Sequence, residues 1–346
     1  MKRSKAVTGA ILILLLVAIV ITFLLNITLG SVKIPLQSVL NILIGLDIEK
    51  STWTNIILKS RLPQTITALL AGSGLAVAGL IMQTFFRNPL AGPSVLGISS
   101  GSSLGVALVL LLAGQIGDVS LSSMGLAGDL GVTFAAFFGA IFVLVLMLFM
   151  AGKTQNNVTL LIIGMMIGYG VSALVSILKF YSHKDDLHAF VIWGMGSFAG
   201  VSQSDLLIFA PMCLLGLILA FAFIKPLNAL LLGENYASNL GVNVLKIRWI
   251  LVMISGLLVA IITAYTGPIA FIGLAVPHLC RSLFLTSDHK VLIPGVLLTG
   301  ALIALACNLI ARMPGFDSAL PINAVTSLFG APVVIWVIMK KKSIAG

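Results

Sequence analysis

Apolar residues in this chain form long stretches that short polar segments interrupt. A helix needs about 20 consecutive apolar residues to cross the hydrocarbon core of a bilayer. In lipid, backbone polar groups must be satisfied within the segment, so runs of this length predict membrane-spanning helices. We place spans at about 6–29, 62–83, 94–113, 126–150, 158–180, 204–224, 247–266, 269–285, 291–311 and 322–339. The pattern therefore predicts an all-α integral membrane protein with about ten spans, organised as one transmembrane domain over residues 1–346.

The composition agrees with this interpretation, because 59% of the 346 residues are hydrophobic and only 9% are charged. A soluble globular domain carries roughly 25% charged residues. The first apolar run follows the charged sequence MKRSK, which resembles the start of a signal peptide. That run is too long for a signal peptide and lacks a small-residue cleavage site, so we interpret it as a retained first span.

The distribution of positive charge predicts the orientation of the spans. An even number of spans places both termini on one side, and cytoplasmic loops carry the excess of Lys and Arg. Of the 20 Lys and Arg residues, 13 then lie on the inner side and seven on the outer side, so both termini are predicted to be cytoplasmic. The net charge of +10 is a topology signal and does not indicate nucleic-acid binding. The seven outer residues are Lys33, Lys50, Lys59, Arg61, Lys179, Lys184 and Arg312.

Acidic residues are absent from the middle of every predicted span. Proton pumps and ion-coupled carriers usually place ionisable groups inside the membrane. Here all ten acids fall in loops or at span ends, so no coupling carboxylate is visible and we expect any uphill transport to draw its energy from elsewhere. The ten are Asp47, Glu49, Asp118, Asp129, Asp185, Asp186, Asp205, Glu234, Asp288 and Asp317.

The sequence offers no nucleotide or metal motif. Gly152, Lys153 and Thr154 imitate the end of a phosphate-binding loop, but the first glycine of that motif would stand at Met147. The cysteines lack CxxC pairing and the histidines lack HExxH spacing, so we expect no metal and no catalytic nucleophile. These residues are Cys213, Cys280, Cys307, His183, His188, His278 and His289.

Small residues predict close helix contacts. Gly97, Gly101 and Gly105 are spaced four apart, as are Gly164 and Gly168. Residues four apart share one helix face and let helix backbones approach closely in lipid. We favour this packing role, although the serines between those glycines could also line a polar path.

One cytoplasmic connection, residues 225–246, is longer and more polar than a simple link between spans requires. Within it, residues 230–244 read LLLGENYASNLGVNV. Asn-rich edges suit caps and turns, so we predict two short helices around Gly233 and Gly241. The segment is either a docking surface for a cytoplasmic partner or a helix lying on the lipid headgroups.

The pattern Glu234-x-x-Ala237-x-x-x-Gly241 resembles the coupling loop of bacterial ABC importer permeases. Five further motifs occur in order from about residue 30 to the C-terminus. Together they resemble the FecCD family, the permeases for import of iron-siderophores, haem and cobalamin. The motifs are RLP at 61–63, GLIMQ at 79–83, NPLAGPSVLG at 88–97, FIGLAVPH at 271–278, and LPI at 320–322 with GAP at 330–332.

The resemblance implies a permease of the bacterial cytoplasmic membrane that works beside a second permease, either identical or a sister chain. It further implies two ATPase subunits that hydrolyse ATP, and an extracytoplasmic substrate-binding protein. On this chain it assigns ATPase coupling to Glu234, Ala237 and Gly241, and it implies no enzymatic activity and no bound cofactor.

The resemblance assigns docking of the binding protein to Arg61 and Arg312, which would meet glutamates of that partner. Exposed ion pairs of this kind steer encounter more than they add affinity. The alternative for each is an arginine that extends to the membrane interface. Gln64 stands where the family usually has another arginine, so the docking charge is expected to be lower by one, with Lys59 near enough to compensate.

The resemblance also assigns a cytoplasmic gate to Asn88, Leu90 and Asn157, where polar amides and a leucine would close a narrow path. The alternative is that these asparagines cap helices. Two other functional classes stay open at this point. An ion- or proton-coupled carrier of a bulky solute would need an acid near the midplane, and an intramembrane enzyme would need a convergent catalytic pair, which the sequence does not show.

Overall fold

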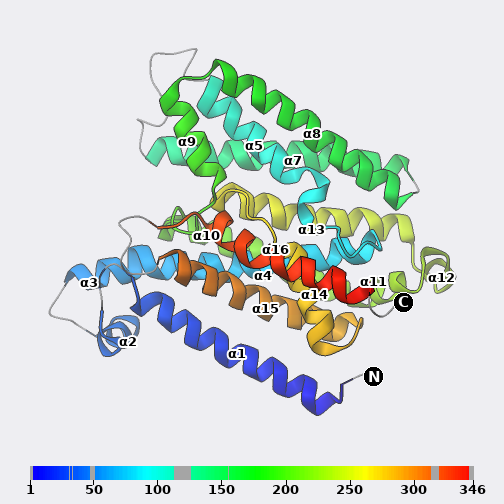
Figure 1. The fold of residues 1–346 in the computed structure, drawn as a ribbon, viewed down its shortest axis with the longest axis horizontal. Coiled ribbons are helices and arrows are strands. Elements are labelled where there is room, and N and C mark those ends of the chain that lie inside the picture. The colour runs from blue at the N-terminus through cyan, green and yellow to red at the C-terminus, as the bar shows by residue number, and fades with distance from the viewer. Residues whose placement is uncertain are drawn as a thin grey trace.

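The computed structural model describes residues 3–30, 32, 34–46, 51–112, 126–154, 156–312 and 319–342, and all the regular structure within these ranges is helical. Asp47, Glu49, Asp118 and Asp317 of the predicted loop acids lie outside the described residues. The long helices run side by side, and both termini lie at the same end of the molecule as α11 and α12 (Figure 1). The helices are α1 (Lys5–Thr28), α2 (Leu36–Ile44), α3 (Ser51–Asn55), η1 (Ile56–Arg61), α4 (Leu62–Phe85), η2 (Pro93–Leu96), α5 (Ile98–Ala107), η3 (Leu108–Leu112), α7 (Leu126–Lys153), α8 (Asn157–Tyr181), α9 (Lys184–Gly194), α10 (Gln203–Ala222), α11 (Ile224–Leu231), α12 (Glu234–Asn239), α13 (Val244–Thr266), α14 (Ile272–Phe284), α15 (His289–Ala311) and α16 (Ile322–Lys342).

Seven helices in the described ranges are long and apolar enough to cross a membrane, and three shorter apolar helices accompany them. The ten overlap the ten predicted spans. The second is longer than predicted, because α3, η1 and α4 form one continuous helix over Ser51–Phe85. The eighth is shorter, because α14 begins only at Ile272. The all-helical prediction is confirmed, whereas ten complete crossings stay a prediction.

Helix α4 lies at the centre of the bundle. Its span is 89% buried, against 17% for α1 and 22% for α8 at the rim. The neighbours α1, α10, α13, α14 and α15 all pack against α4. A helix surrounded by protein on every side has no lipid-facing stripe, and its polar residues must find partners on other helices.

Glycine makes the close contacts around α4 possible. A Cβ atom on Gly79 of α4 would lie 1.7 Å from the carbonyl oxygen of Gly273 in α14. A Cβ on Gly72 of α4 would lie 2.3 Å from the carbonyl oxygen of Gly300 in α15. The predicted packing role of glycine is confirmed further along the chain, where a Cβ on Gly101 of α5 would lie 2.4 Å from a backbone oxygen of α7.

Three buried amides join the outer ends of α1, α4 and α15. The side chain of Asn308 donates to Asn26 at 2.8 Å and accepts from Gln64 at 3.0 Å. Asn26 in turn donates to the carbonyl of Leu305 at 3.0 Å. Gln64 is only 6% exposed. Its side chain points into the protein and completes a hydrogen-bonded chain, and the expected effect of the absent charge on docking stays a prediction.

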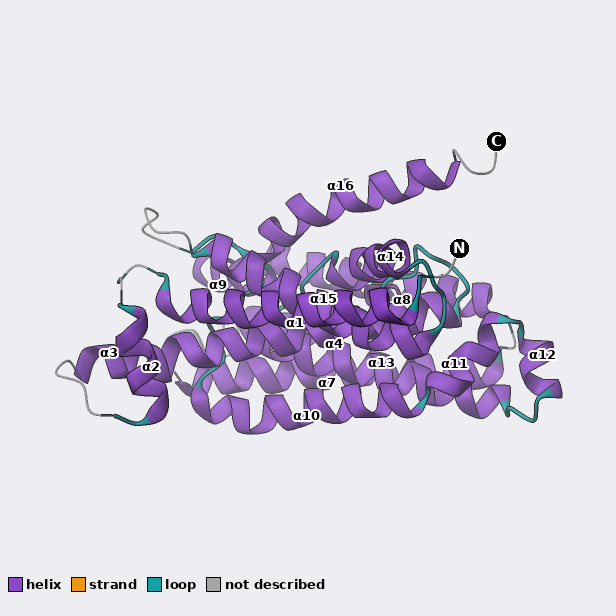
Figure 2. Ribbon diagram, turned by 90° about the horizontal axis from the view of Figure 1, so that it is seen from below, coloured by secondary structure: helices purple, strands orange, loops and turns teal. Residues whose placement is uncertain are grey.

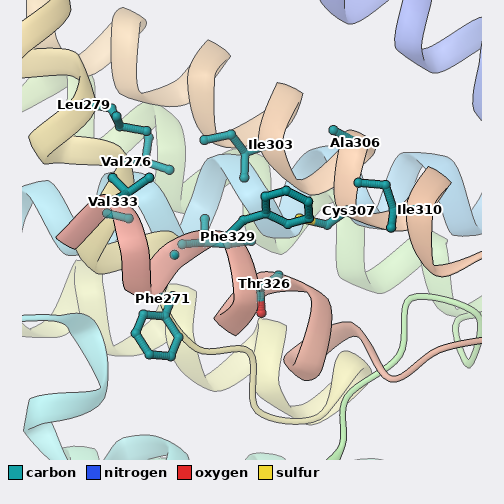
Figure 3. Close-up of a pocket in the computed structure, with 13 residues that line it drawn as sticks. Phe271, Val276, Leu279, Ile303, Ala306, Cys307, Ile310, Thr326, Phe329 and Val333 are labelled. Carbon is teal, nitrogen blue, oxygen red and sulfur yellow. The ribbon is translucent and has the colours of Figure 1, made fainter. Parts of the chain in front are cut away.

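Helix α16 packs less closely than the central helices. It leans away from the body of the bundle (Figure 2). A cavity of about 260 Å³ lies between α14, α15 and α16, and its lining is almost entirely apolar (Figure 3). Val276, Ile303, Cys307 and Phe329 line it from the three helices. Tight backbone contacts hold α4 to α14 and α15 and hold α5 to α7, whereas α16 borders a cavity.

We expect Gly79→Ala to prevent normal folding, because the added methyl group would overlap the Gly273 backbone and α4 cannot move away from its neighbours. Overpacking of this kind costs about 1–3 kcal/mol or more. Thermal unfolding of the detergent-purified protein measures the effect. Gly170→Ala in α8 is the matched control, since a Cβ there meets nothing within 4 Å. Equal melting temperatures for the two variants would contradict the packing described for α4.

Candidate functional site

The polar connection between α10 and α13 folds into the two predicted short helices, α11 and α12. Two glycines bracket α12, Gly233 at φ +122° and Gly241 at φ +81°. Side chains other than glycine rarely adopt these angles. Ala237 is fully buried between them, while Gly241 is exposed. The spacing of Glu234, Ala237 and Gly241 therefore corresponds to the short helix α12, and a glycine with a positive φ angle fixes the backbone on each side of it.

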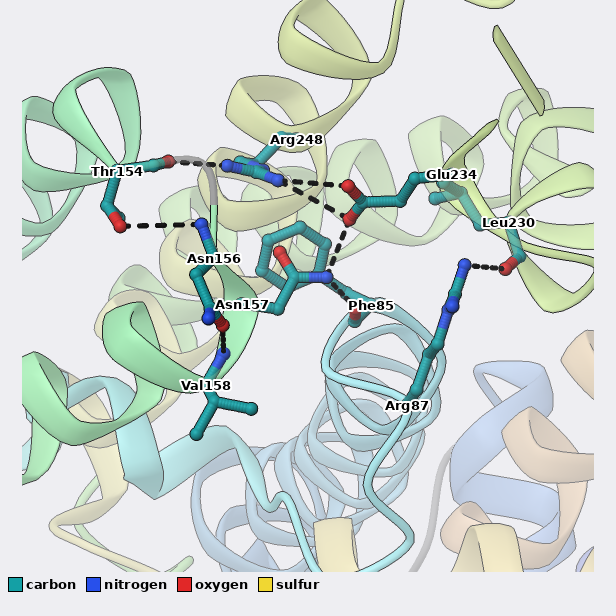
Figure 4. A network of polar contacts seen from close by, with 9 residues as sticks. All are labelled: Phe85, Arg87, Thr154, Asn156, Asn157, Val158, Leu230, Glu234 and Arg248. Atoms are coloured by element: carbon teal, nitrogen blue, oxygen red, sulfur yellow. Dashed lines mark hydrogen bonds and ion pairs between the residues drawn. The ribbon is translucent and has the colours of Figure 1, made fainter. Parts of the chain in front are cut away.

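Glu234, the first residue of α12, is the centre of a polar network (Figure 4). Its Oε1 accepts a hydrogen bond from the Asn157 side chain at 2.7 Å. Arg248 of α13 approaches both carboxylate oxygens, at 3.3 and 3.4 Å. The side chain of Glu234 is about 30% exposed and that of Arg248 about 4%. An ion pair that is partly withdrawn from water is screened less than a surface pair.

Arg248 extends the network to the loop after α7. Its Nη1 donates to the carbonyl of Thr154, and its guanidinium lies over the ring of Phe85, 5.9 Å from the centroid. The charge pattern of the sequence places Arg248 only among the 13 Lys and Arg residues predicted on the inner side. Its position one turn inside the apolar helix α13 could have indicated an acidic partner, because a buried guanidinium needs one.

Asn157 and Arg87 tie the network to α4. Asn157 donates to the carbonyl of Phe85 at 3.0 Å, so one amide group bonds both α12 and the last turn of α4. Arg87, just beyond α4, donates to the carbonyl of Leu230 in α11 at 3.4 Å (Figure 4). The ends of α4, α7, α8 and α13 thus meet at the two short helices.

The residues predicted to form a gate do not share one environment. Asn88 accepts from the backbone N–H of Leu90 at 2.9 Å, which closes a turn, and the Leu90 side chain is 49% exposed. Asn157 belongs to the Glu234 network. The cap of α8 is Asn156, whose side chain accepts from the N–H of Val158, so the capping alternative does not apply to Asn157.

On the opposite face, Arg61 is 2% exposed and does not present its guanidinium to the outside. It donates to the carbonyls of Ile27 and Thr28 at 2.8 and 2.9 Å, and also to the carbonyl of Val32. The last carbonyls of a helix have no partner within the helix, and a cation at this end interacts favourably with the helix dipole. Arg61 therefore closes the outer end of α1.

Arg312 lies beside Arg61 at the end of α15. Gly30 separates the two, since a Cβ on Gly30 would lie 2.8 Å from a guanidinium nitrogen of Arg61 and 3.2 Å from one of Arg312. Burial, and secondarily the charge of Arg61, lower the pKa of Arg312. Its Nη1 has no hydrogen-bond partner within the described residues. Lys59 is exposed on the same face.

Within the described ranges, no group of three or more His, Cys, Asp or Glu side chains lies close enough together to hold a metal ion. Fold and site define the class of the protein as a polytopic α-helical membrane protein whose helix ends converge, at one end of the bundle, on two short helices.

Comparison with known proteins specifies the family. The sequence profile of the FecCD transport family matches residues 15–340. The vitamin B12 import system permease protein BtuC of Salmonella typhi is 39% identical over 282 residues, which are 81% of this chain and 82% of that protein. The BtuC protein of Salmonella newport strain SL254 has the same identity and coverage.

Among solved structures, a metal-chelate type ABC transporter in an inward-facing conformation superposes with a TM-score of 0.82 at 32% identity, over 96% of this chain and 99% of that one. The PsaBC complex of Streptococcus pneumoniae shares the fold at a TM-score of 0.58 and 17% identity, over 88% of this chain and 95% of that one. The chain belongs to the FecCD transport family. It is a permease of the metal-chelate and vitamin B12 type of ABC importer.

We expect Glu234→Lys to detach α12, because the new ammonium group would face the guanidinium of Arg248 and the amide of Asn157. Leaving these buried donors without an acceptor costs about 1–3 kcal/mol. Amide hydrogen exchange of residues 234–239 should rise. Ser238→Lys introduces the same charge at an exposed position of α12 and is the control. Unchanged exchange in Glu234→Lys would show that the network does not hold the helix.

We expect Arg61→Ala to lower the thermal stability of the protein, because the carbonyls of Ile27, Thr28 and Val32 lose their donor. Hydrogen bonds to a charged group are worth about 1.5–3 kcal/mol each. Lys59→Ala, which removes an exposed cation from the same helical turn, is the control. If both variants melt at the same temperature, Arg61 is not the group that closes α1.

Proposed function

We propose that this chain is the membrane subunit of an ATP-driven importer that passes a bulky metal chelate, such as a ferric siderophore, haem or cobalamin, into the cytoplasm. It receives the chelate from an extracytoplasmic binding protein. The observation that carries the proposal is the Glu234 network, which bonds α12 to the ends of α4, α8 and α13. The relatives described as vitamin B12 import permeases support the substrate class.

Two ATPase subunits would dock on α11 and α12 of two paired permeases, with both termini of this chain on the same cytoplasmic side. Closure of the ATPases on ATP would displace Glu234, Ala237 and the turn at Gly241. Because Glu234 is bonded to Asn157 and Arg248, the displacement would reach three membrane helices at once. This chain would hydrolyse no ATP and leave the chelate chemically unchanged.

The segment that follows α4 would form the cytoplasmic gate. Leu90 is half exposed on a turn that Asn88 fixes, and the same turn is held by His278, whose Nε2 lies 2.6 Å from the carbonyl oxygen of Pro89. Movement of Asn157 with α12 would pull on the carbonyl of Phe85, only a few residues before this turn. Gate and coupling loop would therefore move together.

Docking of the binding protein would depend on Arg312 and Arg61 in different ways. Among the described residues, one buried N–H group of Arg312 has no hydrogen-bond partner, and it could donate to an incoming carboxylate. Arg61 would attract the carboxylate through its positive charge without touching it, while its hydrogen bonds hold the end of α1 in place. A bidentate pair with a carboxylate needs the planar guanidinium, which Lys59 cannot supply.

Uptake measurements test the function and identify the substrate. Cells without this gene, and the same cells carrying it back, are compared for uptake of radiolabelled cyanocobalamin, ferrichrome and haemin. We expect at least a tenfold loss of one compound in the deletion strain, since coupled import fails without its membrane path. Restoration by the wild-type gene and failure of restoration by Glu234→Lys would support the coupling role.

The rival carrier hypothesis makes the opposite prediction in a purified system. Vesicles that contain this chain alone, supplied with a proton or sodium gradient, should not accumulate any compound of the panel. Vesicles that also contain the ATPase subunits and internal ATP should. Gradient-driven uptake by the chain alone would overturn the proposed function and favour a secondary transporter.

A further inference from the structure

A second polar bridge, separate from the Glu234 network, anchors α11. Asn228 lies in the middle of α11 and is half-buried. Its Nδ2 donates to Oδ1 of Asp288 at 2.7 Å, and its Oδ1 accepts from the backbone N–H of His289 at 2.9 Å. The ring of His289 also contacts this oxygen, with Nδ1 at 2.8 Å, and its Nε2 lies 2.8 Å from the hydroxyl of Thr84 in α4.

The donors and acceptors of this bridge allow one arrangement of protons. The Asn228 atom that faces a backbone N–H must be the oxygen, so Nδ1 of His289 donates to it and carries the ring proton. Nε2 is then an acceptor, and the hydroxyl of Thr84 must donate to it. His289 is fully buried, and its neutral imidazole is satisfied on both sides. The bridge runs without a gap from α11 to α4.

The bridge also holds the first turn of α15. Asp288 caps this helix by accepting from the N–H of Lys290 at 2.9 Å. Burial alone would raise the pKa of Asp288, but the hydrogen bonds from Lys290 and Asn228 hold it below its usual range. Further along, α15 and α4 touch backbone to backbone at Gly72 and Gly300. A displacement of α11 would therefore move α15 and α4 as one body.

The two bridges end on neighbouring residues of α4. The Asn228 bridge reaches the side chain of Thr84, and the Glu234 network reaches the carbonyl of Phe85. One begins on α11 and the other on α12, so each of the two protruding helices has its own bonded route to the same helix end. The Asn228 route is the more deeply buried, because Thr84 is 2% exposed and His289 is 0% exposed.

We infer that Asn228 is a positioning residue that transmits movement of α11 through His289 and Thr84 to α4 and α15, so that ATP hydrolysis is converted into transport. The inference rests on the proposed function and adds a second transmission route to it. If Asn228 only stabilised the fold, its replacement would lower the amount of folded protein. If Asn228 transmits movement, its replacement lowers the number of molecules imported per ATP hydrolysed.

Asn228→Asp is the sharpest variant, because it keeps the shape and the acceptor for His289 but places a carboxylate oxygen against Asp288. Asp288→Asn is the matched control, because the amide oxygen that replaces Oδ1 can still accept from both Asn228 and the backbone N–H of Lys290. Asparagine also caps a helix well, so α15 keeps its first turn. This control changes the charge of the bridge by one unit, as Asn228→Asp does, but keeps its hydrogen bonds.

The experiment uses the complex of the full chain with its ATPase subunits in vesicles, and the compound among cyanocobalamin, ferrichrome and haemin that the wild type imports. The ratio of uptake to ATP hydrolysis is measured for each variant. We expect Asn228→Asp to lower the ratio about tenfold, a typical coupling effect, and Asp288→Asn to keep at least half of the wild-type ratio. An unchanged ratio in Asn228→Asp, or an equal loss in a well-folded Asp288→Asn variant, overturns the inference.

Thr84→Val and Thr84→Ser decide the question if Asn228→Asp does not fold. Valine removes the donor to His289 with little change of shape, whereas serine keeps it. The ratio should fall in the first variant and stay near the wild-type value in the second, and equal ratios would overturn the inference. If the wild-type complex imports no compound of the panel in an ATP-dependent manner, the proposed function fails first, which separates the two outcomes.

Discussion

The C-terminal end of α4 determines which of the surrounding helices are bonded to one another. This helix is enclosed by other helices, so the polar groups at its end cannot turn to water and must be bonded by neighbours. Three consecutive residues meet this requirement with three different elements. Gln83 bonds Arg281 and the carbonyl of Leu274 in α14. Thr84 bonds His289 of α15, and the carbonyl of Phe85 bonds Asn157 of α8. The C-terminal end of α4 is thereby bonded to α14, α15 and α8.

The outer end of α4 is fixed by a different set of bonds. Gln64 and Asn308 hold it to α15 and α1, and Arg61, just before α4, binds the last carbonyls of α1. Between the two ends, glycine contacts leave no room for a methyl group. The helix is therefore rigid along its length and bonded at both ends, and movement at one end cannot be absorbed by local repacking.

Much of this architecture follows from the sequence. Long apolar runs predicted the helices, and the polar connection with its two glycines predicted two short helices, which are α11 and α12. The resemblance to coupling loops singled out Glu234, whose role stays a prediction. The orientation of long polar side chains did not follow, because Arg61 and Gln64 stand at a helix start, where a side chain can point outward or inward. Only the positions of Asn26, Asn308 and the α1 carbonyls decide between these directions. His289 and Asn228 were missed for the same reason, since they are 61 residues apart and become partners only in the folded chain.

The helices at the centre of the bundle and those at its rim differ in how closely they are packed. The spans of α1 and α8 are mostly exposed in the single chain, and α16 rests against a cavity. In lipid, apolar faces gain little by meeting one another, so close packing and interhelical hydrogen bonds decide which helices move together. Both hold α4 to its neighbours α14 and α15. The bonds from this central unit to α11 and α12 end on the buried residues Thr84, His289 and Arg248, so breaking one of them leaves a buried polar group without a partner. A force on the two protruding helices is therefore more easily expressed as a shift of the whole central unit against the rim than as a distortion within it.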